Sequence, residues 1–332
     1  MNIKQSITEL IGHTPLLELN GIAGDLGLNA HIIAKLEYYN VNMSSKDRAA
    51  LRIIEDAERN GTLRYEQTVV ETTSGNTGIS LAAICAAKGY RFLAYMQDGV
   101  TEERYRTINA FGCETINFSE IESVNKAMKE TGGNFMAGLN ALKEELRERD
   151  DLFYTDQCFN TSNPDVHRDT TGPEIWEDTD GEVDIIVACV GTGGTISGIG
   201  QYIKSKNPLV EIVAVEPDED AMPHPDYPNR NVIDGIERIS DVHDDEIPGT
   251  VDFSVIDKIV SVSAKDAYEV SRQVARKDGV LLGSSSGAAI HAAIELAKLK
   301  ENFGKRIVVI APDTGLRYLS TNLYKEVDYE DK

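Results

Sequence analysis

The sequence predicts an α/β fold built around parallel sheets, and three observations indicate this class. Short runs rich in valine and isoleucine alternate along the chain with longer amphipathic segments, as strands and helices do when they follow one another. These runs are apolar throughout, as expected for strands that helices cover on both faces. Glycine-rich turns follow three of the runs, at the edge of a sheet where ligands usually bind.

The expected elements alternate along most of the chain. Strands are predicted where short apolar runs occur, at residues 31–37, 69–72, 91–96, 184–190, 211–215, 258–262 and 306–311. Helices are predicted where the pattern is longer, at residues 45–60, 76–88, 101–111, 135–149, 196–206, 264–277 and 286–300. Residues 216–245 are expected to form a long loop, because they hold many acids and Pro223, Pro225 and Pro228.

The composition excludes several classes of function. The 332 residues contain 33 Lys and Arg against 55 Asp and Glu, a net charge of -22 that opposes binding to nucleic acid or to an anionic membrane. An anionic small molecule is still compatible with this charge, since backbone N–H groups can hold a phosphate. No apolar stretch approaches about 18 residues, and the start lacks the apolar core of a signal peptide, so we expect no transmembrane helix and a cytoplasmic location.

The cysteines do not predict a metal site. Cys85, Cys113, Cys158 and Cys189 lie far apart, with no Cys-x-x-Cys pair and no histidine spacing typical of zinc. We expect four reduced thiols and no bound metal.

The first glycine-rich turn suits a carboxylate. Residues 73–78, Thr-Ser-Gly-Asn-Thr-Gly, follow an expected strand and open an alanine-rich helix. They offer hydroxyl groups, an amide side chain and free backbone N–H groups at a helix N-terminus. A tight turn with an Asn or Ser cap is the plainer alternative.

The second turn suits a phosphate. Residues 191–195, Gly-Thr-Gly-Gly-Thr, lie between an expected strand and an expected helix. Glycines let the backbone approach an anion closely, and the helix dipole favours a phosphate there. The turn is not a dinucleotide fingerprint, because that register requires glycine at position 196, where the chain has Ile196. A P-loop motif is also missing from the sequence.

A third turn and a lysine complete the set. Residues 283–289, Gly-Ser-Ser-Ser-Gly-Ala-Ala, lie between a short apolar run and a helix, and on their own could be another helix cap. Ligands bind at the carboxyl ends of strands in open sheets, so we expect the three turns to converge on one crevice. Lys46 alone would be a surface charge, but a lysine beside a phosphate turn can form a Schiff base with an aldehyde cofactor.

Together these motifs resemble the cysteine synthase and cystathionine β-synthase family, the fold type II (β-family) pyridoxal-phosphate enzymes. The matching stretches are residues 44–48 (Ser-x-Lys-Asp-Arg), 73–78, 163–164 with 170–176, 191–195 and 283–289, and residues 317–321 look like the family's C-terminal signature. The resemblance runs from Ile7 to Leu319 and implies two doubly wound α/β domains with the cofactor in the cleft between them. The larger domain would comprise residues 1–48 and 155–322 and the smaller, mobile domain residues 49–154, followed by an acidic tail at 323–332.

The resemblance also implies roles for single residues. Lys46 would hold pyridoxal 5'-phosphate as a Schiff base and later move the substrate's α-proton, and Asn76 would bind the ring hydroxyl. Ser285 would face the pyridine nitrogen without holding it protonated, which favours loss of a β-substituent over transamination. The residues expected to cradle the phosphate are Gly191, Thr192, Gly193, Gly194 and Thr195. The residues expected to bind the substrate are Thr73, Ser74, Gly75, Thr77, Gln157 and Gly235.

The implied reaction is β-replacement, in which O-acetylserine and sulfide give L-cysteine and acetate. The chain departs from the family's usual residues at Val41, Gln97 and Cys158, and it has Asp-Gly-Ile-Glu at 234–237 where sulfhydrylases have Gln-Gly-Ile-Gly. An alternative hypothesis follows, in which Asp234 is a base that activates water or a thiol. Cysteine would then be consumed, releasing sulfide and forming L-serine or a thioether. The plainer interpretation makes Asp234 and Glu237 two more acids of an acidic loop.

Further alternatives have less support. O-phosphoserine as the donor would need a nearby cation to bind its phosphate. Arg238 is the evident candidate, but the neighbouring Glu237 would repel the phosphate. A nicotinamide oxidoreductase is disfavoured by the failed fingerprint, and an inactive cofactor-binding regulator by the joint presence of Lys46, Asn76 and Ser285. The resemblance also implies a homodimer, and some family members bind a serine acetyltransferase.

Overall fold

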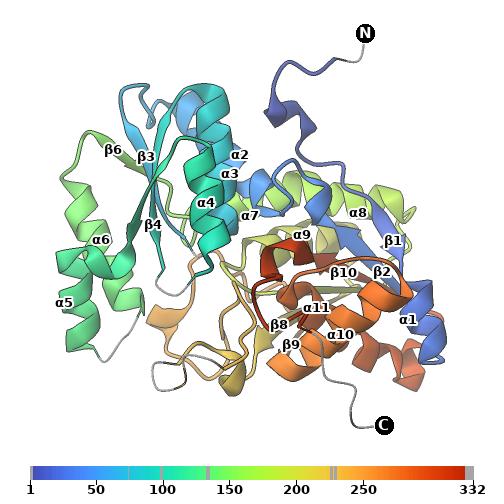
Figure 1. Ribbon diagram of the computed structural model, residues 1–332. Coiled ribbons are helices and arrows are strands. Elements are labelled where there is room, and N and C mark those ends of the chain that lie inside the picture. The colour runs from blue at the N-terminus through green and yellow to red at the C-terminus, as the bar shows by residue number, and fades with distance from the viewer. Residues whose placement is uncertain are drawn as a thin grey trace.

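The computed structural model describes residues 3–73, 75–97, 100–131, 135–224, 227 and 230–325. The predicted α/β class is confirmed, because helices cover two largely parallel sheets that lie side by side (Figure 1). The first sheet has the order β1 (Leu16–Glu18), β2 (His31–Leu36), β10 (Arg306–Ala311), β7 (Ile185–Cys189), β8 (Glu211–Pro217), β9 (Lys258–Val262). Only β1 pairs antiparallel within this order. The second sheet has the order β5 (Glu114–Asn117), β4 (Arg91–Met96), β3 (Thr68–Thr73), β6 (Leu152–Tyr154), and its pairs are parallel.

Helices pack on both faces of each sheet. Those whose buried residues join the core of the first sheet are α1 (Asn20–Asp25), α8 (Gly172–Asp178), α9 (Gly194–Lys206), α10 (Ala264–Lys277) and α11 (Ser284–Ala297). Those whose buried residues join the core of the second sheet are α2 (Lys46–Asn60), α3 (Asn76–Lys88), α4 (Glu102–Ala110), α5 (Glu122–Glu130) and α6 (Phe135–Arg147). The short α7 (Ser162–Val166) packs against both α2 and α9. Each sheet therefore has two separate apolar layers, one on each face.

Local sequence explains where several helices begin and end. The helices α2 and α3 both stop at a glycine in the left-handed region, Gly61 with φ 77° and Gly89 with φ 82°. The helix α10 begins after Ser263, whose side chain accepts a hydrogen bond from the backbone N–H of Asp266.

All the strands predicted from the sequence are present, and so are the predicted helices, with bounds that differ by a few residues. The helices α9 and α11 begin two residues earlier than expected. The last two residues of the second turn and all but the first residue of the third turn therefore lie inside helices. The sequence did not predict the short strands β1, β5 and β6 or the helices α1, α5, α7 and α8.

The expected loop at 216–245 needs one correction. Its first residues, Glu216 and Pro217, continue the strand β8, and the side chain of Glu216 is buried. The buried carboxylate accepts hydrogen bonds from the backbone N–H groups of Ile239 and Ser240, both 2.9 Å long, which tie the loop to the strand. Outside this strand and two 3₁₀ turns, Glu219–Ala221 and Asp244–Glu246, the described part of the stretch is irregular. Pro225 and Pro228 lie outside the described residues.

The start of the expected acidic tail is packed. Leu323 is fully buried and the Tyr324 hydroxyl donates to the carbonyl of Leu282 at 2.6 Å, whereas residues 326–332 lie outside the described part. The predicted domain limits stay predictions. Among the residues that the structure describes, no helix combines the length and the apolar character needed to cross a lipid bilayer.

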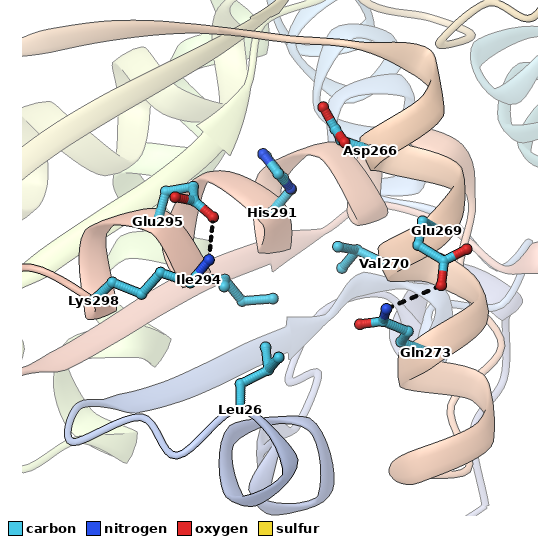
Figure 2. A pocket seen from close by; sticks show the side chains of 9 residues that line it. All are labelled: Leu26, Asp266, Glu269, Val270, Gln273, His291, Ile294, Glu295 and Lys298. Atoms are coloured by element: carbon cyan, nitrogen blue, oxygen red, sulfur yellow. Dashed lines mark hydrogen bonds and ion pairs between the residues drawn. The ribbon is translucent and has the colours of Figure 1, made fainter.

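A surface pocket lies among α1, α10 and α11. Figure 2 shows the apolar side chains of Leu26, Val270 and Ile294 pointing toward one another, with polar side chains around them. Glu295 pairs there with Lys298 at 2.6 Å. None of the residues predicted to bind cofactor or substrate lines this pocket.

Candidate active site

Lys46 is the first residue of α2, at the carboxyl end of β2 after a short connection. The preceding residues are tied to the end of β10, because the backbone N–H of Ser45 donates to the carbonyl of Pro312 at 2.9 Å. Burial lowers the pKa of the Lys46 amine, and the nearby Cys158 and Asp313 oppose that shift only in part. Within the described residues the amine has no hydrogen-bond partner. A lysine with a depressed pKa is more often neutral, which is the nucleophilic form.

Polar contacts fix the first turn of α2. The carboxylate of Asp47 accepts from the backbone N–H of Asn42 at 2.7 Å and from the hydroxyl of Ser80 in α3. Arg48 is buried and lies between two carboxylates, Glu37 at 2.8 Å and Glu174 at 2.6 Å. These contacts tie the start of α2 to residues that follow β2, to α3 and to α8, so the position of Lys46 is well determined.

The first glycine-rich turn closes on itself at the end of β3. The hydroxyl of Thr73 accepts from the backbone N–H groups of Gly75 at 3.0 Å and Gly78 at 3.1 Å. Gly75 has φ 150°, and a Cβ there would lie 2.5 Å from the side chain of Arg104, so the position requires glycine. Ser74 lies outside the described residues.

Gln157 lies against this turn. The hydroxyl of Thr77 donates to its side-chain oxygen at 2.6 Å, and its side-chain amide donates to the carbonyl of Thr72 at 3.1 Å. The backbone N–H of Gln157 donates to the carboxylate of Glu71 at 2.9 Å. Glu71 is 1% exposed, and this burial raises its pKa to about 7 despite its hydrogen bonds. Glu71 thus holds the segment that carries Gln157.

The second turn fits a phosphate group. It ends at the N-terminus of α9, and a Cβ on Gly194 would lie 2.3 Å from the Asn163 side chain, so a larger residue would not fit. Gly193 has φ 86°, where L side chains are rare. The amide of Asn163 donates to the hydroxyl of Thr192 at 2.8 Å. The free N–H groups of a helix start and close-packed glycines are what an anion needs.

The third turn and the end of β10 form a buried polar cluster. Ser285 is 5% exposed in the first turn of α11. The carboxylate of Asp313 accepts two hydrogen bonds, from the side-chain amide of Asn76 at 2.8 Å and from the hydroxyl of Tyr318 at 2.6 Å. The guanidinium group of Arg317 donates to the side-chain oxygen of Asn76. Asp313 therefore links the end of β10 to the start of α3.

Several buried polar atoms near these turns lack partners. In the part of the chain that the structure describes, the hydroxyls of Ser44 and Ser286 and one carboxylate oxygen of Asp313 make no hydrogen bond. Unpaired buried polar atoms are costly, so their grouping around Lys46 and Ser285 is typical of a site that receives a polar ligand. Together with the second turn and the lowered pKa of Lys46, they fit pyridoxal phosphate.

The loop with Asp234 packs against the second turn and the residue before it. The backbone N–H of Asp234 donates to the hydroxyl of Ser284 at 3.2 Å. The backbone N–H of Glu237 donates to the carbonyl of Val190 at 2.8 Å. A Cβ on Gly191 would lie 2.4 Å from the carbonyl oxygen of Gly235, so the loop packs closely on the second turn. Burial raises the pKa of Asp234, and Arg104, at 3.6 Å, counteracts this rise. The Asp234 loop is therefore part of the candidate site.

The two acids of this loop differ in exposure. The side chain of Glu237 reaches solvent, but the protein atoms around its carboxyl group desolvate it and raise its pKa to about 7. The side chain of Asp234 is only 30% exposed.

Sequence reasoning missed four residues of this region: Glu71, Arg104, His167 and Asp313. Asp313 lies two residues after the end of β10, so the rule that ligands bind at strand ends could have found it. Glu71 is an acid inside an apolar strand, which is a usable signal as well. The side chain of His167 contacts the Thr195 hydroxyl at 3.2 Å. No local sequence pattern indicates Arg104 or His167, because the contacts of both side chains form only in the folded chain.

Comparisons with known proteins agree with this geometry. Residues 7–313 match the family described as "Pyridoxal-phosphate dependent enzyme". The chain is 40% identical over 320 residues to a cysteine synthase of Staphylococcus aureus, covering 96% of each chain.

Solved structures are similar as well. The O-acetylserine sulfhydrylase isoform 3 of Entamoeba histolytica has a TM-score of 0.83 and 36% identity over 99% of this chain and 93% of that one. A hydrogen sulfide-producing enzyme of Fusobacterium nucleatum has a TM-score of 0.81 and 34% identity over 96% of this chain and 100% of that one. The fold, the candidate site and these matches agree, and the chain belongs to the family of pyridoxal-phosphate dependent enzymes that includes the cysteine synthases.

Proposed function

We propose that the protein replaces the acetoxy group of O-acetyl-L-serine by sulfide, giving L-cysteine and acetate. The observation that carries this proposal is the joint position of a lysine with a depressed pKa, a glycine turn at the start of α9 and a hydroxyl-rich turn at the start of α3. The cysteine synthase of Staphylococcus aureus and the Entamoeba sulfhydrylase support the same reaction.

The residues of the second and third turns would hold the cofactor. Backbone N–H groups from Gly191 to Thr195, with the hydroxyls of Thr192 and Thr195, would bind its phosphate, while Asn76 and Ser285 would bind its ring. Bound pyridoxal phosphate supplies an electron sink for the carbanion that forms at the substrate α-carbon. Ser285 offers a neutral hydroxyl to the ring, so this sink is moderate and favours loss of the β-substituent.

The first turn would orient the amino acid. Thr73, Ser74, Gly75 and Thr77 would present N–H and hydroxyl donors to its carboxylate at the start of α3, and Gln157 would add its amide. The Lys46 amine, whose pKa is lowered by burial, would take the α-proton and return it after the nucleophile adds. Gly235, with φ 76° over the second turn, would contact the substrate and help exclude water.

Cysteine formation from O-acetyl-L-serine and sulfide tests this function. The protein loaded with pyridoxal phosphate is titrated with O-acetyl-L-serine while its visible absorption is recorded, and sulfide is then added. We expect a spectral change with the amino acid, its reversal with sulfide, and cysteine and acetate in equal amounts. A protein that binds pyridoxal phosphate but yields no cysteine would contradict the proposal.

A second candidate is the consumption of cysteine, with release of sulfide and formation of L-serine or a thioether. The observation that favours it is the half-buried carboxyl of Asp234, whose raised pKa makes it a stronger base, beside Ser284 and the second turn. The sulfide-producing enzyme of Fusobacterium nucleatum is a structural neighbour. Incubation with L-cysteine, with separation of serine from pyruvate, tests it. Pyruvate alone, or unchanged product formation in Asp234→Asn, would contradict it.

We also propose that the enzyme works as a homodimer in the cytoplasm. The N-terminal segment projects from the body (Figure 1) and exposes Ile3 and Leu10, 66% and 50% accessible, which a second copy could cover. All four cysteines are free, which suits a reducing compartment. Light scattering on the purified protein should give the mass of two chains. Association with a serine acetyltransferase stays a prediction.

A further inference from the structure

Arg104 and Asp234 form an ion pair beside the candidate site, and its chemistry points to substrate selection. We propose that Asp234 excludes amino-acid donors with an anionic β-substituent, such as O-phospho-L-serine, by placing a carboxylate next to Arg104. The proposal rests on the proposed β-replacement function and assigns a specificity role to this one side chain.

Arg104 lies against the turn proposed to bind the substrate carboxylate. It comes from α4 and is 5% exposed. Its Cδ lies 2.5 Å from the position that a Cβ on Gly75 would occupy, and its guanidinium group stands 5.5 Å from the ring centre of Tyr318. Packed on both sides, the guanidinium group has little freedom to turn away. It is therefore a fixed positive charge at the edge of the first turn.

Asp234 reaches the same guanidinium group from the loop at residues 234–237. Its backbone N–H donates to Ser284, the first residue of α11, and the next residue, Gly235, packs on Gly191 of the second turn. Its carboxylate lies 3.6 Å from a guanidinium nitrogen of Arg104. The pair thus spans the space between the turn proposed for the substrate carboxylate and the turn proposed for the cofactor phosphate. A β-substituent of a substrate held between them would lie close to both charges.

The charge of Asp234 determines the electrostatic environment of such a β-substituent. A buried Arg104 alone would attract a phosphate dianion, since guanidinium groups match phosphate geometry. With Asp234 beside it, the cation is already compensated and a phosphate would face a carboxylate, whereas the uncharged acetyl ester of O-acetylserine loses nothing. Selectivity of this kind comes from a built-in repulsion rather than from a new contact.

Other polar groups act on the same pair, but none of them takes the place of Asp234. Asp313 and Tyr318 act on Arg104, and Arg317 lies in the same cluster, where it is influenced by Asp47 and Asp313. All of these stay in place when only Asp234 is changed. Asp234→Asn keeps the size and the backbone contacts of the side chain and shifts the local charge by one positive unit.

The test compares the two donors in matched variants. The variants are Asp234→Asn, the double variant Asp234→Asn with Arg104→Gln, and the control Asp241→Asn, an exposed acid of the same loop at φ 56°, which asparagine tolerates. Visible absorption of the pyridoxal-phosphate-loaded protein gives the half-saturating concentration of O-phospho-L-serine and of O-acetyl-L-serine without requiring turnover. Rates with sulfide give kcat/KM for each donor.

We expect Asp234→Asn to shift the ratio of half-saturating concentrations toward O-phospho-L-serine by about tenfold, slightly more than the effect of one unit charge pair about 4 Å apart in bulk water. The control should leave the ratio unchanged, and the double variant should lose the gain. Asp234→Gln serves as a second neutral variant should the asparagine variant fold poorly.

Three outcomes would overturn the proposal: an unchanged ratio in both neutral variants, an equal shift in Asp241→Asn, or tighter binding of O-phospho-L-serine than of O-acetyl-L-serine by the unaltered protein. Failure of the proposed function looks different, because the unaltered protein would then make no cysteine from either donor while the binding ratio could still be measured. A role of Asp234 only as a base would reduce turnover of cysteine and leave the binding ratio unchanged.

Discussion

At the scale of single residues, burial sets the acid–base chemistry of this protein. Lys46 and Glu71 are both surrounded by protein, and burial favours the neutral form of each, so the lysine pKa falls and the carboxyl pKa rises. Lys46 uses this shift as a proposed nucleophile and base. Glu71 instead accepts hydrogen bonds that position Gln157. Its titration should make the free energy of unfolding depend on pH.

Glu71 should make the protein less stable as the pH rises. Its pKa is about 7 in the folded chain against 4.5 for the free side chain, so between these values the folded state binds more protons than the unfolded state. The stabilisation is complete below about pH 4.5 and is lost as the pH rises through 7, a change of roughly 3 kcal/mol from this group. Urea unfolding at pH 5 and pH 8 measures it.

The matched variants are Glu71→Gln and the exposed control Glu66→Gln. Glu71→Gln should be less stable at both pH values, because its amide faces N–H donors, but its loss of stability between pH 5 and pH 8 should be smaller. Equal losses in Glu71→Gln and Glu66→Gln would show that Glu71 does not titrate in this range.

Some residues of the candidate site could be proposed from the sequence and others could not, for a physical reason. Lys46, Asn76 and Ser285 lie in contiguous motifs whose function depends on local geometry, a turn and the helix start that follows it. Arg104 and Asp234 are of interest only because they form an ion pair, and 130 positions of sequence separate them. Only the packing of α4 against the loop brings these two together.

At the scale of elements, α2 connects the two sheets. Its first turn is bonded to Glu37 after β2 and to Glu174 in α8, while Ala50, Ile54 and Ala57 pack into the core of the second sheet. A helix held at both sheets keeps Lys46 fixed at its start. Arg48 is the residue on which that attachment depends most.

Arg48→Met should destabilise the protein by about 3–5 kcal/mol, because it leaves the fully buried Glu37 carboxylate without its cation. Urea unfolding measures the loss. The control is Arg106→Gln, which breaks an exposed pair with Glu102 and should cost at most about 1 kcal/mol. Similar losses in both variants would mean that the Arg48 cluster does not anchor the helix.

The strands that the sequence failed to predict are short. The strands β1, β5 and β6 contain only three or four residues, too few for a periodic pattern, and they exist because a longer strand pairs with them. The strand β8 continues through Glu216 because its carboxylate is satisfied by the loop at Ile239 and Ser240. Tertiary contacts of this kind leave no trace in a single window of sequence.

At the scale of the whole molecule, an acidic chain of net charge -22 builds anion sites from neutral groups. The candidate phosphate and carboxylate sites consist of glycine, threonine, serine and asparagine at the starts of α9 and α3, and they need no net positive charge. The three turns come from different sheets and helices, so a bound ligand would contact both halves of the fold.

Removing the cofactor should therefore lower the melting temperature of the whole protein. A ligand at 100 times its dissociation constant adds about 2.7 kcal/mol to the free energy of unfolding. Calorimetry of the loaded protein and of the protein stripped with hydroxylamine measures the shift, and added pyridoxal phosphate should restore the higher temperature. Identical melting temperatures would contradict binding across the two halves.

The site of covalent cofactor attachment directly tests whether Lys46 lies at the centre of the active site. The protein is loaded with pyridoxal phosphate, reduced with borohydride, digested and mapped by mass spectrometry, with Lys46→Ala and the exposed Lys265→Ala as companions. We predict that the reduced cofactor is attached to Lys46, that the label is lost in Lys46→Ala and that it persists in Lys265→Ala. A stoichiometric label on another lysine, or an undiminished label in Lys46→Ala, would contradict the assignment of the active site.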